Sequence, residues 1–384
     1  MKIIHSKKEL IAIIDNDRMK DYKITLIPTM GNLHQGHLSL VDTSACFRSR
    51  KIVSIFVNPL QFDNLSDFAS YPKSLEEDLR VLERKKIEFV IVDNFSTGHK
   101  KFVKNKKFFE LDLKDPEEIR VNLQDQEITS IVHFAGLSIV SDSQKKEKEY
   151  YENNVLASMN LAKFALEKKI RKFIFSSSAA VYGIPEEVPI KENHPTKPIN
   201  NYGKNKLEIE NILKKLSMEH PLDVVCLRYF NAAGADEDGD IGEERNPETH
   251  LIPNIIKSVL QSNEFFIHGD TYDTNDGTCI RDYIHVNDLA SAHLSSLKFL
   301  DSNKGFHIFN LGSEQGFSVM EVIDECQKLM KTAIKFKIGS KRDGDPNILV
   351  ADNKKSISKL GWKLENNSLK SIISSAINFH KNAL

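Results

Sequence analysis

Six short apolar runs recur in the first part of the chain, and they constrain the fold more than any other feature of the sequence. They are rich in Val, Ile and Phe: 24-ITLIPT, 52-IVSIFVN, 87-IEFVIVD, 129-TSIVHFAG, 172-KFIFSSS and 223-DVVCLRYFN. Stretches with helical spacing, 74-SLEEDLRVLERKK and 157-ASMNLAKFALEKK, separate some of them. Continuous apolar strands that alternate with helices are typical of a parallel sheet covered on both faces. We therefore predict an α/β fold, a doubly wound parallel sheet followed by a smaller, loop-rich C-terminal lobe.

The composition is that of an enzyme with a large core. Of the 384 residues, 40% are hydrophobic and 28% are charged, and the formal net charge is −1. This balance gives no reason to expect a nucleic-acid partner, and no run approaches the length of a membrane span. The N-terminus MKIIHSKKEL lacks an apolar signal segment, and the four cysteines lack metal-ligand spacing. We expect a cytoplasmic protein with reduced thiols and without a metal site.

A tyrosine and a lysine in 201-NYGKNK are the strongest candidates for catalysis. Tyr202 and Lys206 are four residues apart, so they share one face of a helix. A nearby ammonium stabilises a phenolate and lowers the pKa of the tyrosine, which can then act as a base. Ser178, at the end of the preceding apolar run, can share the hydrogen bond to the reacting hydroxyl. Such a pair is common and usually structural, but its place downstream of 176-SSSAAVYG is a strong signal.

The sequence around these residues resembles that of one enzyme family from about residue 91 to the C-terminus. The matching segments are VDNFSTGH, VHFAGLSIV, YYENNV, FSSSAAVYG, NYGKNK, LRYFNAAGA, ETHLIPNI, DGTCIRDYIHVNDLA, FNLGSEQGFSVMEVI and the late 361-GWK. Together they resemble the UDP-glucose 4-epimerases, extended short-chain dehydrogenases/reductases of galactose metabolism that keep NAD bound. The resemblance implies a Rossmann-like NAD-binding core over about 91–230, a substrate lobe over about 231–384, and isomerase activity on UDP-glucose and UDP-galactose.

The resemblance also implies roles for individual residues. Tyr202 would take the proton from the sugar 4-hydroxyl, Lys206 would tune Tyr202 and hold the nicotinamide ribose, and Ser178 would complete the hydrogen bonds at the 4-oxygen. Positions that match the family's cofactor-binding residues are Asp93, Asn94, Phe95, Ser96, Thr97, Gly98, Asp112, Leu113, Phe134, Ala135, Gly136, Leu137, Ser138, Asn153 and Phe230. Positions that match its substrate-binding residues are Asn231, His250, Leu251, Phe266, His268, Arg281, Arg342 and Asp345.

Departures from the family pattern narrow the chemistry. The dehydratases of the superfamily carry an Asp-Glu pair where this chain has Ala179 and Ala180, so epimerisation is favoured over elimination of water. Leu349 lies where many relatives carry a tyrosine, and a smaller side chain would admit N-acetylated sugars. Ser138 replaces a lysine that is common in the family. Each substrate-side arginine can instead be a surface ion-pair residue, but a planar guanidinium is well suited to a diphosphate.

The first ninety residues resemble a different family. His34 and His37 bracket Gly36 at an expected helix start, a position suited to phosphate, although two surface histidines would look the same. PTMGNLHQGHLSLV and VSIFVNPLQFDNLSDFASYPKSLEEDLRVLE together resemble the start of pantoate–β-alanine ligase (pantothenate synthetase), which is similar to nucleotidyltransferase-like adenylating enzymes. The resemblance implies that Met30 to His37 line ATP, that His37 is the active-site histidine and that Gln61 binds pantoate. The family's second half does not follow, so we expect no ligation.

The join between the two resemblances falls inside the strand that ends at Asp93. In a dinucleotide-binding fold this strand comes about 20 residues after a glycine-rich turn that binds pyrophosphate. Upstream of Asp93 the only glycines are Gly31 and Gly36. The ligase fragment would therefore supply the first strand and helix, with side chains where the backbone must approach phosphate. We expect weakened NAD binding and an impaired epimerase.

The alternatives are a ligase fragment that binds ATP and an inactive product of gene fusion. The expected ligand is a nucleotide sugar, and a homodimer is a further expectation.

Overall fold

The computed structural model describes residues 4, 6–19, 23–29, 49–55, 89–104, 106–342 and 345–382. The chain forms two compact units, Met1–Phe89 and Val90–Leu384. The expected helix over residues 74–86 and the ligase-like residues Met30, His34, His37 and Gln61 lie outside the described residues.

The described strands are β1 (Lys23–Thr29), β2 (Ser49–Ile55), β3 (Val90–Asp93), β4 (Lys107–Glu110), β5 (Ser130–His133), β6 (Lys172–Ser178), β7 (Asp223–Tyr229), β8 (Asn231–Ala233), β9 (Phe265–His268), β10 (Ile280–His285), β11 (Phe306–Leu311), β12 (Gly316–Ser318), β13 (Phe336–Gly339) and β14 (Ile348–Leu349). The described helices are α1 (Lys7–Met19), α5 (Pro116–Leu123), α6 (Val140–Lys145), α7 (Glu147–Tyr150), α8 (Ala157–Glu167), α9 (Asn201–Glu219), α10 (Leu251–Leu260), α11 (Val286–Ser302), α12 (Val319–Met330), α13 (Lys354–Leu360) and α14 (Leu369–Asn382), with short turns η2 (Lys100–Val103), η3 (Tyr151–Leu156) and η4 (Ala179–Val181).

The first unit contains a parallel strand pair with one helix. β1 pairs with β2 in the register Lys23↔Ser49 to Thr29↔Ile55, and α1 packs against β1. The hydroxyl of Thr29 donates a hydrogen bond to the carbonyl of Ser54 at 2.9 Å, which ties the ends of the two strands together. The first two apolar runs of the sequence therefore form strands, as predicted.

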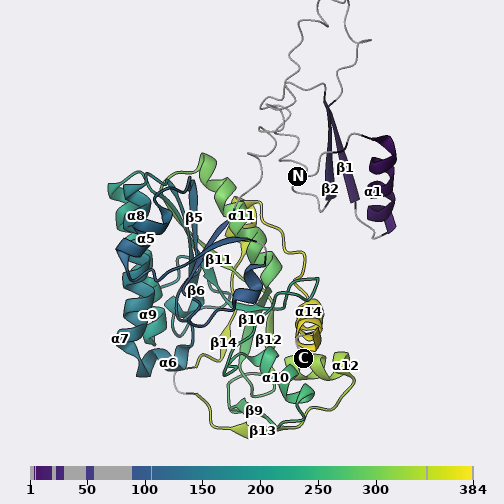
Figure 1. Cartoon of the computed structure of the whole chain (residues 1–384). Coiled ribbons are helices and arrows are strands. Elements are labelled where there is room, and N and C mark those ends of the chain that lie inside the picture. The colour runs from purple at the N-terminus through teal and green to yellow at the C-terminus, as the bar shows by residue number, and fades with distance from the viewer. Residues whose placement is uncertain are drawn as a thin grey trace, which may run out of the picture. The chain divides into compact units, whose positions relative to one another are not determined.

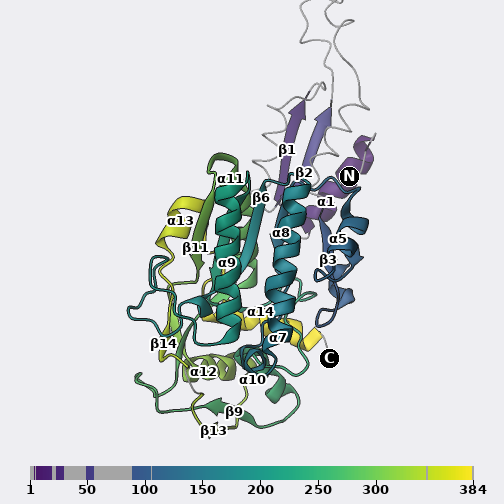
Figure 2. The same cartoon turned by 90° about the vertical axis from the view of Figure 1, so that its left-hand side faces the viewer.

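The core of the second unit is the parallel sheet β11-β7-β6-β5. α8 and α9 lie on one face of this sheet and α11 lies on the other (Figures 1 and 2). Alternation along β6 explains why both faces are apolar: Phe173 and Phe175 join the cluster on the side of α8 and α9, whereas Ile174 joins the cluster on the side of α11. This two-sided burial confirms the predicted doubly wound α/β fold.

β3 and β4 form a separate parallel pair. In a doubly wound sheet with the order 3-2-1-4-5-6, the first strand lies between the second and the fourth. In this chain β3 and β4 correspond to the second and third strands of that order. β5, β6 and β7 correspond to the fourth, fifth and sixth. None of the strands in the described ranges pairs with both β3 and β5. The position of the first strand therefore has no occupant among the described residues of this unit.

The C-terminal part of the chain divides between a second lobe and the core. β10 pairs with β12, β14 and β8, and α10, α12 and α14 cover this sheet in their own apolar cluster. β11, however, pairs with β7 over the register Phe306↔Val224 to Leu311↔Tyr229. A division of the chain at residue 230 consequently cuts the core sheet, because α11 and β11 return to it before the second lobe is complete. Among the described helices, none combines the length and the apolar character needed to cross a membrane.

Candidate active site

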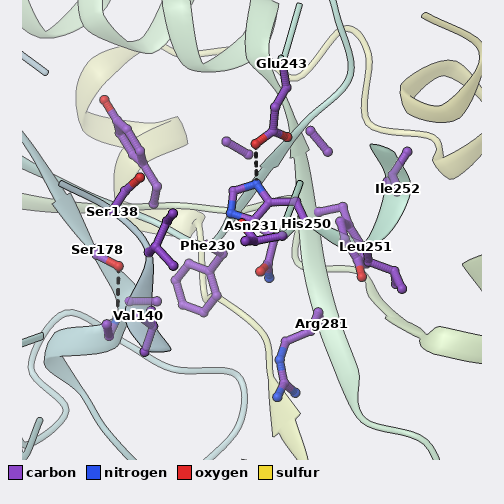
Figure 3. A pocket seen from close by; sticks show the side chains of 18 of the residues that line it. Ser138, Val140, Ser178, Phe230, Asn231, Glu243, His250, Leu251, Ile252 and Arg281 are labelled. Atoms are coloured by element: carbon purple, nitrogen blue, oxygen red, sulfur yellow. Dashed lines mark hydrogen bonds and ion pairs between the residues drawn. The ribbon is translucent and has the colours of Figure 1, made fainter. Parts of the chain in front are cut away.

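A cavity of about 1150 Å³ lies beyond the carboxyl ends of β6 and β7, between the core sheet and the second lobe. Parallel sheets place their functional residues at this edge. Its lining includes these sequence-predicted residues: Phe134, Gly136, Ser138, Ser178, Tyr202, Lys206, Phe230, Asn231, His250, Leu251, Phe266, His268, Arg281, Arg342 and Asp345. Figure 3 shows Ser138 and Ser178 on one side of the cavity and His250 and Leu251 on another.

Ser178 and Tyr202 meet at the end of β6. Ser178 is the last residue of the strand, and its hydroxyl accepts a hydrogen bond from the amide of Ala180 at 3.2 Å. Tyr202 lies in the first turn of α9, which begins after Asn200, whose side chain accepts from the Gly203 amide at 2.8 Å. Burial raises the pKa of Tyr202, and a hydrogen bond with Ser178 opposes that rise. In the free protein this phenol therefore stays protonated to a higher pH than an ordinary tyrosine does.

Lys206 is a buried ammonium one turn further along α9. Its side chain is 5% exposed, and Nζ donates a hydrogen bond of 2.7 Å to the carbonyl of Ser176. Nζ lies 4.8 Å from the centroid of the Phe175 ring and 5.7 Å from that of Tyr202. Burial lowers the pKa of Lys206 to about 8, and the charge of Glu210 partly offsets that effect. Its strand contact orients the ammonium beside the phenol.

Two further residues support this lysine, and the sequence motifs did not single them out. Glu210 lies one helical turn after Lys206, and its carboxylate accepts hydrogen bonds from Arg228 Nε at 3.0 Å and Nη2 at 2.6 Å. The Ser177 hydroxyl donates to the same carboxylate at 2.5 Å. Both charged side chains are 3% exposed, so this is a buried pair with satisfied hydrogen bonds. The spacing of Glu210 after Lys206 is the one local signal that could have indicated it.

The segment after β5 is held by a buried asparagine. The amide of Leu137 donates to Asn154 Oδ1 at 2.7 Å, and Asn154 Nδ2 donates to the Leu137 carbonyl at 3.0 Å. Gly136 has φ 151°, and a Cβ there would lie 3.0 Å from Asn154 Oδ1. Asn153, the residue predicted from sequence, instead donates to the Glu149 carbonyl at 2.8 Å. The structure thus brings Asn154, and not Asn153, to this segment.

A second group of predicted residues gathers at the end of β3 and outside the cavity lining. Asp93 Oδ1 accepts from the Phe95 amide at 2.7 Å, and a Cβ on Gly98 would lie 3.2 Å from Asp93 Oδ2. The residues of this predicted set that do not line the cavity are Asp93, Asn94, Phe95, Ser96, Thr97, Gly98, Asp112, Leu113, Ala135, Leu137 and Asn153. Of these residues, Asp93 to Gly98 lie at the end of β3, and Asp112 and Leu113 follow β4. Ala135 and Leu137 belong to the segment after β5, and Asn153 lies in η3.

Arg281 stands at the far end of the cavity, on β10. Its Nη2 contacts Asp345 Oδ1 at 2.6 Å, and Tyr272 donates its hydroxyl to Asp345 Oδ2 at 3.0 Å. Phe266 and His268 lie on the exposed face of β9, beside this pair. Burial and the nearby charge of Arg342 lower the pKa of His268. Two guanidinium groups, aromatic surface and an imidazole form a site suited to a base and a diphosphate.

A carboxylate that the sequence analysis did not single out joins two other cavity residues. Glu243 Oε1 contacts His250 Nδ1 at 2.5 Å, as Figure 3 shows, and Arg245 Nε at 2.5 Å. Burial raises the pKa of Glu243, but the interactions with His250 and Arg245 outweigh that effect and lower it. Arg245 Nη1 also donates to Ser138 Oγ at 3.1 Å. The second lobe thus reaches across to the segment that follows β5.

Comparison with known proteins decides the family. The model of the NAD dependent epimerase/dehydratase family matches residues 79–312. The UDP-glucose 4-epimerase of Lactobacillus helveticus is 40% identical over 305 residues, which is 79% of this chain and 92% of that protein. This chain belongs to the NAD-dependent epimerase/dehydratase family. The match confirms the resemblance that the sequence analysis gave for residues 91 onward. The residues matched by the family model include the elements from β3 to β11.

Solved structures agree with this assignment. The UDP-glucose 4-epimerase from Brucella ovis in complex with NAD has a TM-score of 0.74 and 37% identity, covering 78% of this chain and 93% of that one. The UDP-Glc/GlcNAc 4-epimerase of Campylobacter jejuni has a TM-score of 0.67 and 37% identity, covering 79% and 94%. A model of pantoate–β-alanine ligase matches residues 2–140, so residues 79–140 match both families. The ligase resemblance therefore extends past the expected join near residue 90.

The residues present fit one half of an NAD molecule. Gly136, Tyr202 and Lys206 line the same cavity, which gives a nicotinamide and its ribose a place between the segment after β5 and the start of α9. No glycine lies between Gly36 and Gly98 in the sequence, and residues 56–88, which precede β3, lie outside the described part of the chain. The residues that can hold the nicotinamide end lie in the cavity, and Asp93 lies apart from them at the end of β3.

Proposed function

We propose that this protein is a UDP-hexose 4-epimerase that holds NAD weakly. The observation that carries the proposal is the convergence of Ser178, Tyr202 and Lys206 in the cavity that Arg281 closes at its far end. A catalytic base and a diphosphate-binding guanidinium in one cavity fit a nucleotide sugar whose sugar ring lies next to the phenol. Weak binding of NAD is proposed because the sequence before β3 has no glycine after Gly36.

The side chains suit proton transfer at the 4-hydroxyl of the sugar. Tyr202 accepts the proton, Ser178 hydrogen-bonds the same oxygen, and the Lys206 ammonium stabilises the phenolate that is formed. Bound NAD supplies reversible hydride acceptance at C4. Ala179 and Ala180 follow Ser178 without an acid, so the flat 4-keto sugar is not dehydrated and can be returned with either configuration.

The sugar specificity is proposed from Leu349. This residue lines the cavity and packs near Ile190 and Tyr182 in a small apolar cluster. A leucine leaves more room than the tyrosine of many relatives, so we expect turnover of UDP-N-acetylglucosamine as well as UDP-galactose. Leu349→Tyr should reduce the N-acetylated activity at least tenfold and leave UDP-galactose turnover within threefold, as measured by product analysis. Turnover of UDP-N-acetylglucosamine no greater than the background rate in the natural chain would contradict this specificity.

UDP-galactose turnover by the full chain tests the proposed function. The protein should purify with far less than one NAD per chain, convert UDP-galactose slowly, and gain activity when millimolar NAD is added. Bound NAD is assayed in the same sample after acid release. Near-stoichiometric NAD in the purified protein would refute the weak-binding part, and absence of turnover at saturating NAD would refute the epimerase itself. A pantoate-, β-alanine- and ATP-dependent activity would instead support a ligase fragment.

A further inference from the structure

Arg245 is a guanidinium in the cavity to which neither the motifs nor the proposed mechanism gives a role. It comes from the connection between β8 and α10, and its side chain is 31% exposed. Nη1 donates to Ser138 Oγ at 3.1 Å, and Nε contacts Glu243 Oε1 at 2.5 Å. A guanidinium has five N–H donors. In the described part of the chain only two of them have partners, so the remainder can bind a ligand in the cavity.

The Glu243 carboxylate fixes the direction of this side chain. It contacts both Arg245 and His250, and His250 immediately precedes α10. The Arg245 side chain is therefore anchored from the second lobe at Nε, and its Nη groups reach the segment that ends at Ser138. An arginine held at one end in this way loses less rotamer freedom when its other donors bind an anion.

The place that Arg245 reaches lacks a cation of its own. Residue 138 is a serine, and its hydroxyl bears no charge. The charge of Arg245 also lies close enough to Tyr202 to lower the pKa of that phenol, which locates the guanidinium on the reaction side of the cavity. Arg281 and Arg342 lie at the other end, with His268 and Asp345.

We propose that Arg245 binds a phosphate group of NAD and supplies, from the second lobe, the positive charge that residue 138 does not provide. This rests on the proposed function, because the ligand is the cofactor of that reaction. The guanidinium donates two N–H groups to the phosphate while Glu243 continues to hold Nε. Arg245 thereby adds a phosphate contact in a chain whose sequence has no glycine between Gly36 and Gly98, and it couples the second lobe to cofactor binding.

The test is NAD affinity, measured by titration calorimetry on the full chain and its variants, with UDP as the second ligand. Loss of a charge-assisted contact corresponds to roughly a 10- to 150-fold change in affinity. Arg245→Gln should therefore weaken NAD binding at least tenfold and change UDP binding less than twofold. Ser138→Lys in the Arg245→Gln background should recover at least a third of the loss in NAD affinity, compared as logarithms of the dissociation constants. Arg245→Lys should lie between the natural chain and Arg245→Gln.

Lys104→Gln is the matched control. Lys104 pairs with Asp240 at 3.1 Å, in the same connection as Arg245, but it does not line the cavity. It removes one positive charge from the same part of the surface and should leave NAD affinity within twofold. Equal NAD affinity in the natural chain and Arg245→Gln overturns the inference and leaves the proposed function standing. Equal losses of NAD and UDP affinity also overturn it. A natural chain that binds UDP but no NAD at ten millimolar overturns the inference and the proposed function together.

Discussion

Lys206 combines two demands that oppose each other. In the proposed mechanism its ammonium stabilises the Tyr202 phenolate, yet Lys206 is 5% exposed and its surroundings disfavour charge. The carbonyl of Ser176 and the nearby carboxylate of Glu210 offset part of the cost. The effect of burial is larger than this compensation, so the pKa of Lys206 is lowered to about 8. Burial of this ammonium therefore costs folding stability.

The pH dependence of unfolding should reveal this cost. Between pH 8 and the usual lysine range, the unfolded chain binds more protons at this site than the folded chain, so the natural protein gains stability as pH rises. Relative to Lys206→Met, the free energy of unfolding of the natural chain should rise by about 3 kcal/mol between pH 8 and 10.5. Urea titrations at several pH values measure this. Lys204→Met, at an exposed site on the same helix, should show no such trend; a flat difference for Lys206→Met would contradict the prediction.

Tyr202→Phe separates chemistry from binding at the same site. The change removes the acidic hydroxyl and retains the ring, so UDP affinity should stay within twofold. Turnover of UDP-galactose at saturating NAD should fall by roughly 10²- to 10⁴-fold, the usual contribution of a positioned acid–base group. A decrease of less than tenfold would show that another group takes the proton. Initial rates with calorimetric UDP binding provide both measurements.

At the scale of elements, the π-helix η3 (Tyr151–Leu156) positions the segment after β5. Asn154 is 1% exposed and makes both of its hydrogen bonds with the backbone of Leu137, whereas its neighbour Asn153 points its amide at Glu149. The sequence YYENNV contains both asparagines, and consecutive residues of a helix point about 100° apart. Only the packing of η3 and α8 against the core selects which of the two faces the segment.

The two asparagines offer a matched comparison. Asn154→Ala leaves the Leu137 amide and carbonyl without partners, which should lower the free energy of unfolding by about 2 kcal/mol. Asn153→Ala removes one half-exposed contact and should cost less than about 0.5 kcal/mol. Chemical denaturation at pH 7 measures both. Equal costs for the two variants would mean that η3 does not hold the segment as the structure shows.

At the scale of the whole molecule, the core sheet of the second unit is divided. β3 and β4 pair with each other, and β5, β6, β7 and β11 form the larger sheet. The first strand of a doubly wound sheet also carries the turn that binds pyrophosphate. Among the described residues of this unit no strand takes the first position, and the sequence has no glycine between Gly36 and Gly98. For these two reasons we propose that cofactor retention is impaired.

A chimaera tests that reasoning directly. Replacement of residues 1–89 by the first strand, glycine-rich turn and helix of an epimerase relative should give a protein that purifies with close to one NAD per chain. The natural chain should retain far less. The same chimaera with alanines in place of the turn glycines is the control and should lose the gain, because Cβ atoms block the approach of the backbone to phosphate. No increase in retained NAD in the chimaera would show that the N-terminal segment is not what limits binding.

The sequence by itself determined the six strands that form from its apolar runs and the pairing of Tyr202 with Lys206. These depend on the fixed periods of strand and helix, which connect residues only a few positions apart. The tertiary structure alone decided that Arg245 reaches Ser138, 107 residues earlier, and that Asp345 holds Arg281, 64 residues away. It also decided that β11 returns to the core sheet. Contacts of this kind depend on the path of the whole chain, and no local spacing specifies them.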